Sequence, residues 1–129
     1  MKLMKRFLPL VLSIFLLAGC ASAPKEASFR QIDMQEAVKL METEKDYIIL
    51  DVRTPEEFRE GHIPGAVNVP NESIGAGEIP ELPRKDQLIL VYCRSGNRSK
   101  QASKKLAQAG YTNITEFGGI RDWPGEIVS

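Results

Sequence analysis

Cys93 is one of two cysteines in the chain and the side chain best suited to act as a nucleophile. Between the apolar segment before it and a helical pattern after it lies a short polar run of Arg94, Ser95, Gly96, Asn97 and Arg98. A helix start offers unpaired backbone N–H groups and partial positive charge, and the two arginines add to it, so a thiol there ionises more easily. Gly96 lets the backbone bend into a nest of inward N–H groups. We therefore expect a nucleophilic thiolate in a cradle for a small anion.

The elements that must position this run alternate between strand and helix patterns. Short apolar runs predict buried strands at residues 47–50, 66–69, 88–92 and 113–117. Helical patterns follow Asp33, begin at Pro55 and cover residues 97–108, and glycines and prolines predict a loop over 73–85. Such alternation indicates a parallel sheet with helices on both faces, so the predicted fold class is α/β. Open parallel sheets place ligand sites at the carboxyl ends of their strands, where Cys93 lies.

Length and composition limit the class of protein. The chain has 129 residues, of which 43% are hydrophobic and 26% charged, and this suits one small globular domain. Seventeen basic side chains balance 17 acidic ones, so we expect no basic face and no nucleic-acid partner. Two cysteines and one histidine are too few for a structural zinc site, and we expect neither a metal nor another cofactor.

The first twenty residues have the pattern of an export signal. Lys2, Lys5 and Arg6 precede an apolar run over residues 7–18, which is short for a transmembrane helix and typical of a secretory signal. The run ends in Leu17-Ala18-Gly19-Cys20, which resembles the lipobox of bacterial lipoproteins and predicts cleavage before a lipidated Cys20. The predicted organisation is a signal over 1–19, a lipidated cysteine and flexible tether over 20–28, and a folded domain over 29–129.

Lipidation of Cys20 has two consequences. The domain is expected to be exported and held by acyl chains on a bacterial membrane, outside the cytoplasm. Cys93 is then left without a partner for an intramolecular disulfide, and a leftover cysteine in an exported protein indicates a reactive thiol or an intermolecular bond. The alternative is a plain signal peptide with an incidental cysteine.

Four short segments of the chain match the pattern of one known family. In chain order they are Asp51-Val52-Arg53 with Glu57-Phe58, Gly61-His62-Ile63-Pro64-Gly65-Ala66, Cys93-Arg94-Ser95-Gly96-Asn97-Arg98-Ser99, and Gly118-Gly119 with Trp123. Each alone is a weak signal, but four in this order with a cysteine in the third are specific. The chain resembles a single rhodanese-like domain over residues 27–123. The resemblance implies an α/β fold with a central, mostly parallel sheet flanked by helices on both faces.

The same resemblance implies a sulfurtransferase. Cys93 is implied to accept a sulfane sulfur as a persulfide and to pass it to a nucleophile. The backbone N–H groups of residues 94–98 are implied to stabilise the persulfide, and Arg94 or Arg98 to contact an anionic donor such as thiosulfate. The implied partners are therefore a small anionic sulfur donor and a thiol, cyanide-like or protein acceptor. We expect the domain to be a monomer.

Three further residues receive supporting roles from the resemblance. Asp51 and Arg53 are implied to lie at an adjacent strand end and to support the active loop. His62 belongs to a segment in which the family's histidine is usually structural and links a strand to a turn. A general-base role for His62 is the alternative.

Two other functions are compatible with this fold. Cysteine-dependent phosphatases and arsenate reductases share it, but their Cys–Arg loop is one residue longer and fits a phosphate-sized oxyanion. Four residues separate Cys93 from Arg98, and this favours a tighter nest for a single sulfur atom. The other alternative is a partner-binding module, which is typical of relatives that have lost the cysteine. The presence of Cys93 in a complete loop argues against that function.

Overall fold

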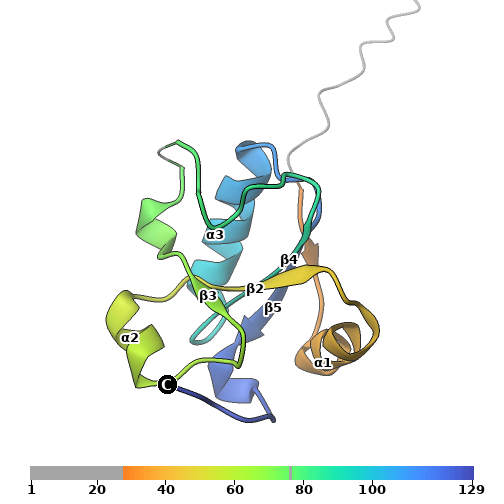
Figure 1. Ribbon diagram of the computed structural model, residues 1–129, viewed down its shortest axis with the longest axis vertical. Coiled ribbons are helices and arrows are strands. Elements are labelled where there is room, and N and C mark those ends of the chain that lie inside the picture. The colour runs from red at the N-terminus through yellow and green to blue at the C-terminus, as the bar shows by residue number, and fades with distance from the viewer. Residues whose placement is uncertain (1–27, 76) are drawn as a thin grey trace, which may run out of the picture.

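The computed structural model describes residues 28–75 and 77–129, which Figure 1 shows in colour. The predicted signal, Cys20 and nearly all of the predicted tether lie outside these residues. Within the described part of the chain, no helix is both long and apolar enough to cross a membrane. The predicted folded domain over 29–129 lies within the described residues, apart from residue 76.

Five strands form one sheet, and every neighbouring pair is parallel. The strands are β1 (Arg30–Gln31), β2 (Tyr47–Asp51), β3 (Val67–Asn68), β4 (Leu88–Cys93) and β5 (Ile114–Gly119). Their order across the sheet is β1-β5-β4-β2-β3, so β4 lies at the centre, and all six of its residues are buried. A continuous apolar run is typical of a strand covered on both faces. The predicted α/β fold with a parallel sheet is confirmed.

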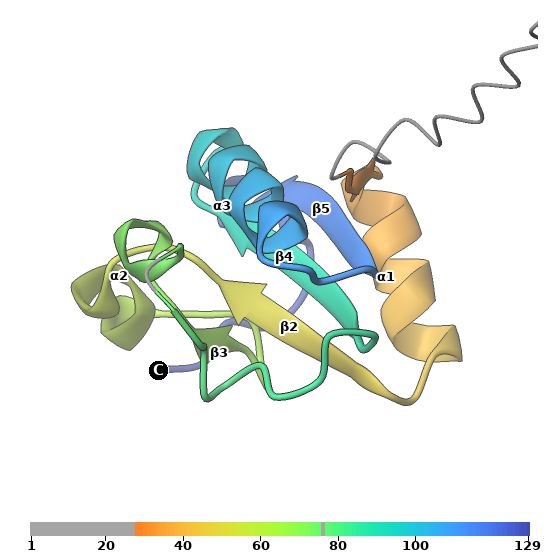
Figure 2. The same cartoon turned by 90° about the horizontal axis from the view of Figure 1, so that it is seen from above.

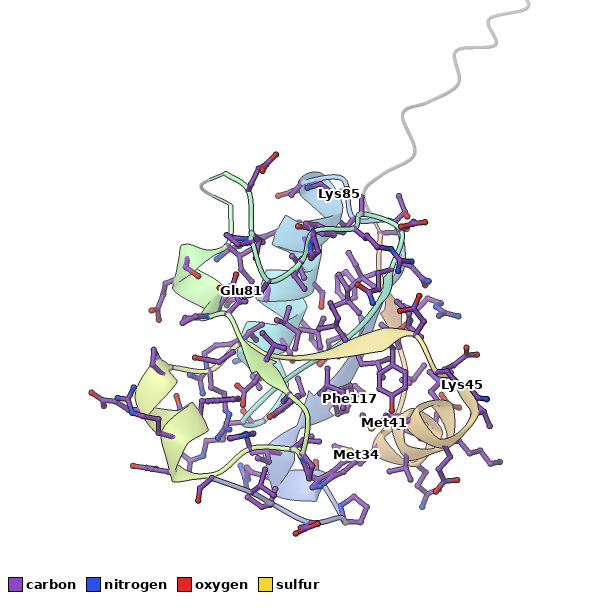
Figure 3. All side chains as sticks on the ribbon, viewed as in Figure 1. Met34, Met41, Lys45, Glu81, Lys85 and Phe117 are labelled. Atoms are coloured by element: carbon purple, nitrogen blue, oxygen red, sulfur yellow. The ribbon has the colours of Figure 1, made fainter. Side chains whose placement is uncertain are left out.

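Helices cover both faces of this sheet. They are α1 (Met34–Thr43), α2 (Pro55–Glu60) and α3 (Asn97–Gln108), with 3-10 turns at Asn71–Ser73 and Ile120–Asp122. α3 packs against β4 and β5 and buries Ala102 and Leu106 completely. Figure 2 shows α1 on the opposite side of the sheet from α3. There Phe117 of β5 packs with Met34 and Met41 of α1, and Figure 3 labels all three.

Local sequence signals explain where the helices begin and end. Asp33 caps α1 by accepting the backbone N–H of Glu36 over 2.8 Å. Thr54 and Glu57 form a reciprocal capping box at the start of α2. α3 ends just before Gly110, whose φ of 98° is the left-handed conformation that terminates helices. These ends agree with the helix boundaries predicted from the sequence.

Strands β1, β3 and β5 differ most from the sequence predictions, whereas β2 and β4 are each one residue longer than predicted. β5 does not end at Phe117 but continues through both glycines, because Gly119 pairs with Cys93 across a register shift in β4. β3 is limited to two residues, and Pro70, which has no N–H for a ladder hydrogen bond, follows close behind it. β1 was not predicted, since two residues that pair with β5 carry too short a pattern to detect.

Candidate active site

Cys93 ends β4 at the carboxyl edge of the sheet, and only 1% of its surface is exposed. Groups of the turn that follows contact its sulfur. The backbone N–H of Gly96 donates to Sγ over 3.0 Å, and the hydroxyl oxygen of Ser99 lies 3.4 Å from Sγ. Both belong to the turn between β4 and α3 or to the first turn of α3. The sulfur therefore lies inside this turn, where the sequence predicted the cradle.

Gly96 gives the turn its shape. Its φ of 109° lies in the left-handed region, which glycine adopts without steric cost. Gly96 is also the N-cap of α3, and no side chain caps the helix. The first N–H groups of a helix have no partner within the helix, so they remain available to an anion or a sulfur. The side chains of Arg94, Ser95 and Asn97 are exposed around the turn.

β5 fixes the position of this turn. The backbone of Gly119 approaches it so closely that an added Cβ would collide with the carbonyl of Arg94 and with the Cα of Ser95. The backbone N–H of Arg121 donates to the same carbonyl over 3.3 Å. In Figure 1 the connection from β4 to α3 lies beside the end of β5. The glycine pair that ends β5 is therefore part of the site, because the turn can lie there only if residue 119 has no side chain.

The surroundings of Cys93 favour its ionised form. Burial alone raises the pKa of the thiol, but hydrogen bonds with Ser99 and with the backbone of Gly96 and Ser95 outweigh it. The net result is a pKa of Cys93 below its ordinary value. A lowered pKa keeps more of the thiol as the nucleophilic thiolate near neutral pH. An enclosed cysteine can therefore be reactive in this turn.

Behind the sulfur, Ser99 is bonded to a buried acid. Ser99 is fully enclosed, and its hydroxyl oxygen lies 2.6 Å from Oε2 of Glu116 on β5. Only 2% of the surface of Glu116 is exposed, and the same oxygen accepts the backbone N–H of Gly118 over 2.8 Å. Among the described residues, no ion pair joins Glu116 to a basic side chain. A line of contacts therefore runs from Cys93 through Ser99 to a carboxylate.

Arg98 is engaged by an acid of α2. Its two terminal nitrogens donate to the two carboxylate oxygens of Glu57 over 2.7 and 3.0 Å. The hydrogen bond from Arg98 is the main cause that lowers the pKa of Glu57 to about 2, against the opposing effect of burial. Because Glu57 also belongs to the capping box, the pair joins the start of α2 to the start of α3. The predicted contact between Arg98 and an anionic donor stays a prediction.

Asp51 and Arg53 lie beside the strand that carries Cys93. Asp51 is fully buried at the end of β2, and its Oδ2 accepts Nη2 of Arg53 and the hydroxyl of Tyr92, each over 2.7 Å. Tyr92 directly precedes Cys93 and is paired with Asp51 across the sheet. Burial raises the pKa of Tyr92, and the hydrogen bond to Asp51 raises it further, so the phenol stays protonated and donates. The cluster braces the end of β4, and the supporting role of Asp51 and Arg53 in catalysis stays a prediction.

His62 is held by contacts with α2 and with the end of the chain. Its Nδ1 lies 2.8 Å from the carbonyl oxygen of Phe58, and the two rings stack with centroids 3.7 Å apart. Its backbone forms an antiparallel bridge with Val128. These contacts link three segments, and the structural role of His62 stays a prediction.

Three side chains of the site were given no role in the sequence analysis. Glu57 was recoverable, because Thr54 and Glu57 have the spacing of a capping box. Ser99 stood in the family pattern without an assigned partner. The only sequence feature that pointed to Glu116 was an acidic residue within the strand predicted over 113–117. Its contact with Ser99 joins α3 to β5 and depends on the tertiary structure.

Comparison with known proteins finds relatives of one family. The rhodanese-like domain family matches residues 33–126. The chain is similar to the thiosulfate sulfurtransferase PspE of Escherichia coli, with 36% identity over 73 residues that cover 57% of this chain and 70% of that protein. It is also similar to a sulfurtransferase of Allochromatium vinosum, with 37% identity over 94 residues that cover 72% and 86% of the two chains. Among solved structures, a rhodanese with anions from E. coli matches with a TM-score of 0.59 and 32% identity, over 64% of this chain and 98% of that one.

Proposed function

The chain belongs to the rhodanese-like domain family, and on that premise we propose that it transfers sulfane sulfur through a persulfide on Cys93. The relatives named as sulfurtransferases support such an activity at the level of the family. The donor is a small anion such as thiosulfate or a persulfide. The acceptor is a nucleophile, either cyanide-like, a thiol, or a cysteine of a partner protein.

Two half-reactions make up the proposed cycle. The Cys93 thiolate attacks the outer sulfur of thiosulfate, a new S–S bond forms at Cys93, and sulfite leaves with the electron pair of the broken S–S bond. In the second half-reaction the acceptor attacks the outer sulfur of the persulfide, and Cys93 leaves as a thiolate. Because the enzyme is covalently modified between the two halves, ping-pong kinetics are expected.

One observation carries this proposal. The sulfur of Cys93 already accepts the N–H of Gly96 over 3.0 Å, inside a turn that opens an uncapped helix. Donors that are fixed in place before the reaction stabilise negative charge without reorganisation. A persulfide carries its charge one atom beyond Sγ, towards the remaining N–H groups of the turn. The same geometry suits the sulfane end of an anionic donor.

The positive charges near Cys93 also fit an anionic donor. Arg94 is exposed at the turn, and the charge of Arg98 interacts with that of Cys93. A related rhodanese was solved with anions, which supports anion binding by this chain as well. We further propose that the domain acts outside the cytoplasm, on a membrane to which a lipidated Cys20 holds it.

Formation of thiocyanate from thiosulfate and cyanide tests the activity. The purified chain is expected to turn over, and Cys93→Ser is expected to abolish turnover with little change in melting temperature, because the exchange is nearly isosteric. Cys20→Ser is the matched control, since it removes the other cysteine and should leave the rate unchanged. Equal rates in the protein and in Cys93→Ser would contradict the proposal. No turnover with any sulfane donor, while Cys93 is reduced and open to alkylation, would favour phosphatase or arsenate reductase activity, or a partner-binding role.

A further inference from the structure

The thiol of Cys93 has very little contact with solvent through which its proton could leave. Cys93 is 1% exposed, and Ser99, which touches its sulfur, is not exposed at all. Sulfur transfer requires the thiolate, so a proton must leave this enclosed position before the first half-reaction. The question is which group takes it.

The contacts behind the sulfur run in one direction. The thiol donates to the Ser99 oxygen over 3.4 Å, and the Ser99 hydroxyl donates to Oε2 of Glu116 over 2.6 Å. Ser99 Oγ also lies 3.0 Å from the carbonyl oxygen of Gly96 and 3.4 Å from that of Gly118, so its hydrogen has two further acceptors nearby. The shorter contact is the one to the carboxylate, as expected for a hydrogen bond assisted by charge.

Glu116 connects this line to the outside. It lines a cavity of about 530 Å³ whose wall also includes Ser95 and Gly96 of the active-site turn, whereas Cys93 and Ser99 do not line it. A proton held on Glu116 can therefore exchange with water in the cavity. The carboxylate accepts two hydrogen bonds and has no ion pair with a basic side chain in the described part of the chain.

We propose that Glu116 is a positioning residue that acts through Ser99 and shares one proton with Cys93. In the transfer the S–H bond breaks and its proton moves to Ser99 Oγ, while the hydroxyl proton of Ser99 moves to Glu116. The products are a thiolate that accepts a hydrogen bond from Ser99, and a carboxylic acid that donates to Ser99. Charge is conserved, and no further reactant is needed. The inference rests on the proposed function for its purpose, because a reactive thiolate is what sulfur transfer requires.

A shared proton has a distinctive pH dependence. The form with carboxylate and thiol and the form with carboxylic acid and thiolate carry the same charge, so their ratio does not change with pH. Two coupled groups lose their protons in two steps that belong to the pair. Cys93 should therefore keep a constant share of thiolate between the two steps. For a lone thiol, the fraction present as thiolate falls about tenfold for each pH unit below its pKa.

Other charged groups also act on this pair. The charge of Arg98 interacts with that of Cys93, and four charged residues line the same cavity as Glu116: Asp33, Glu36, Lys100 and Asp122. Glu36 is exposed on α1 and lines the same cavity as Glu116, and its side chain forms no hydrogen bond with Ser99 in the structure. Glu36→Gln therefore removes the same charge from the same cavity and leaves the line of contacts intact. It is the matched control for Glu116→Gln.

The test is the rate at which iodoacetamide alkylates Cys93, measured against pH by mass spectrometry of the Cys93 peptide. The unsubstituted chain and Glu36→Gln are expected to show two steps with a plateau between them. Glu116→Gln and Ser99→Ala are each expected to show a single step. In these variants the alkylation rate should fall about tenfold for each unit by which the pH is lowered through the plateau range. Melting curves identify any variant that fails to fold, and either variant alone decides the result.

A single step in the unsubstituted chain, or a plateau that survives in folded Glu116→Gln or in folded Ser99→Ala, would overturn the shared proton. The alkylation assay involves no sulfur donor, so its result is separate from that of the proposed function. A plateau without sulfur transfer would leave the proton line standing and remove the sulfurtransferase. Sulfur transfer by a protein with a single-step profile would support the sulfurtransferase and overturn the shared proton.

Discussion

At Cys93, burial and hydrogen bonding act on the pKa of the thiol in opposite directions. The hydrogen bonds with Ser99, Gly96 and Ser95 prevail, and the pKa falls although the side chain is enclosed. The sequence predicted this cradle, since a cysteine, a glycine and a helix start lie together in the chain. It did not predict the carboxylate of Glu116, which reaches Ser99 only after α3 has packed on β5.

Gly119→Ala tests how closely the active-site turn is held. A Cβ at this position collides with the backbone of Arg94 and Ser95, so the turn must move. We expect the free energy of unfolding to fall by about 1–3 kcal/mol, as in other overpacked sites. A displaced turn should slow sulfur transfer by about a hundredfold. Urea unfolding and thiocyanate formation measure the two effects.

Gly110→Ala is the control for this substitution. Gly110 also has a positive φ, but open space surrounds it at the far end of α3. It should cost about 1–2 kcal/mol of stability for the left-handed backbone and leave the rate of sulfur transfer unchanged. If Gly119→Ala kept full activity, the close approach of β5 to the turn would not matter for the chemistry.

Four elements converge on the turn that holds Cys93. β4 carries the cysteine, α3 supplies N–H groups, β5 presents a glycine edge, and α2 holds Arg98 through Glu57. The sequence predicted the helices well, because caps and the helical period are local signals. It missed β1 and the end of β5, because strand pairing between distant segments determines both.

The ion pair between α2 and α3 predicts a pH-dependent stability. The pKa of Glu57 is lowered to about 2 from its ordinary value of 4.5, so its contribution is complete above 4.5 and is lost as the pH falls towards 2. Glu57→Gln keeps a capping side chain but removes the charge. It should lower stability by about 0.5–1 kcal/mol near neutral pH, since the pair is partly exposed.

Melting temperatures measured from neutral pH down to about pH 2 check this expectation. The difference between the protein and Glu57→Gln should shrink as the medium becomes acidic. Glu56→Gln, which alters an exposed neighbour in the same helical turn, should show little effect at any pH. A difference that stayed constant with pH would mean that the charge of Glu57 adds nothing to stability.

Arg98→Ala separates two roles of the arginine. If its charge attracts the donor, the KM for thiosulfate should rise more than the KM for an uncharged sulfane donor. Glu57→Gln breaks the same ion pair but keeps the positive charge, so it should not raise the KM for thiosulfate. Steady-state kinetics with both donors measure the difference. An equal loss on both donors would leave Arg98 with a structural role alone.

Across the whole molecule, one parallel sheet separates two packed faces and brings the site to its carboxyl edge. The alternation of strand and helix patterns was enough to predict this architecture. The buried cluster of Asp51, Arg53 and Tyr92 was not predicted as a unit, because the register between β2 and β4 places the tyrosine beside the aspartate. Sequence patterns therefore predict the helices and strands better than they predict which polar side chains are buried together.

Membrane attachment is a prediction for the whole chain. Expressed in a bacterium that is fed a labelled fatty acid, the protein should carry the label and separate with the membrane fraction. Cys20→Ser should lose the label, because the thiol that accepts the lipid is gone. Cys93→Ser should keep it. A label that persisted in Cys20→Ser, or an unlabelled protein in the soluble fraction, would contradict the predicted lipobox.

The central claim is that sulfur is carried on Cys93, and intact-mass and peptide mass spectrometry after incubation with thiosulfate tests it most directly. The account predicts that the Cys93 peptide gains the mass of one sulfur atom, and that cyanide removes it and yields thiocyanate. Cys93→Ser should gain nothing. A chain that turns over thiosulfate without ever carrying sulfur on Cys93, or that carries it on another residue, would contradict the account.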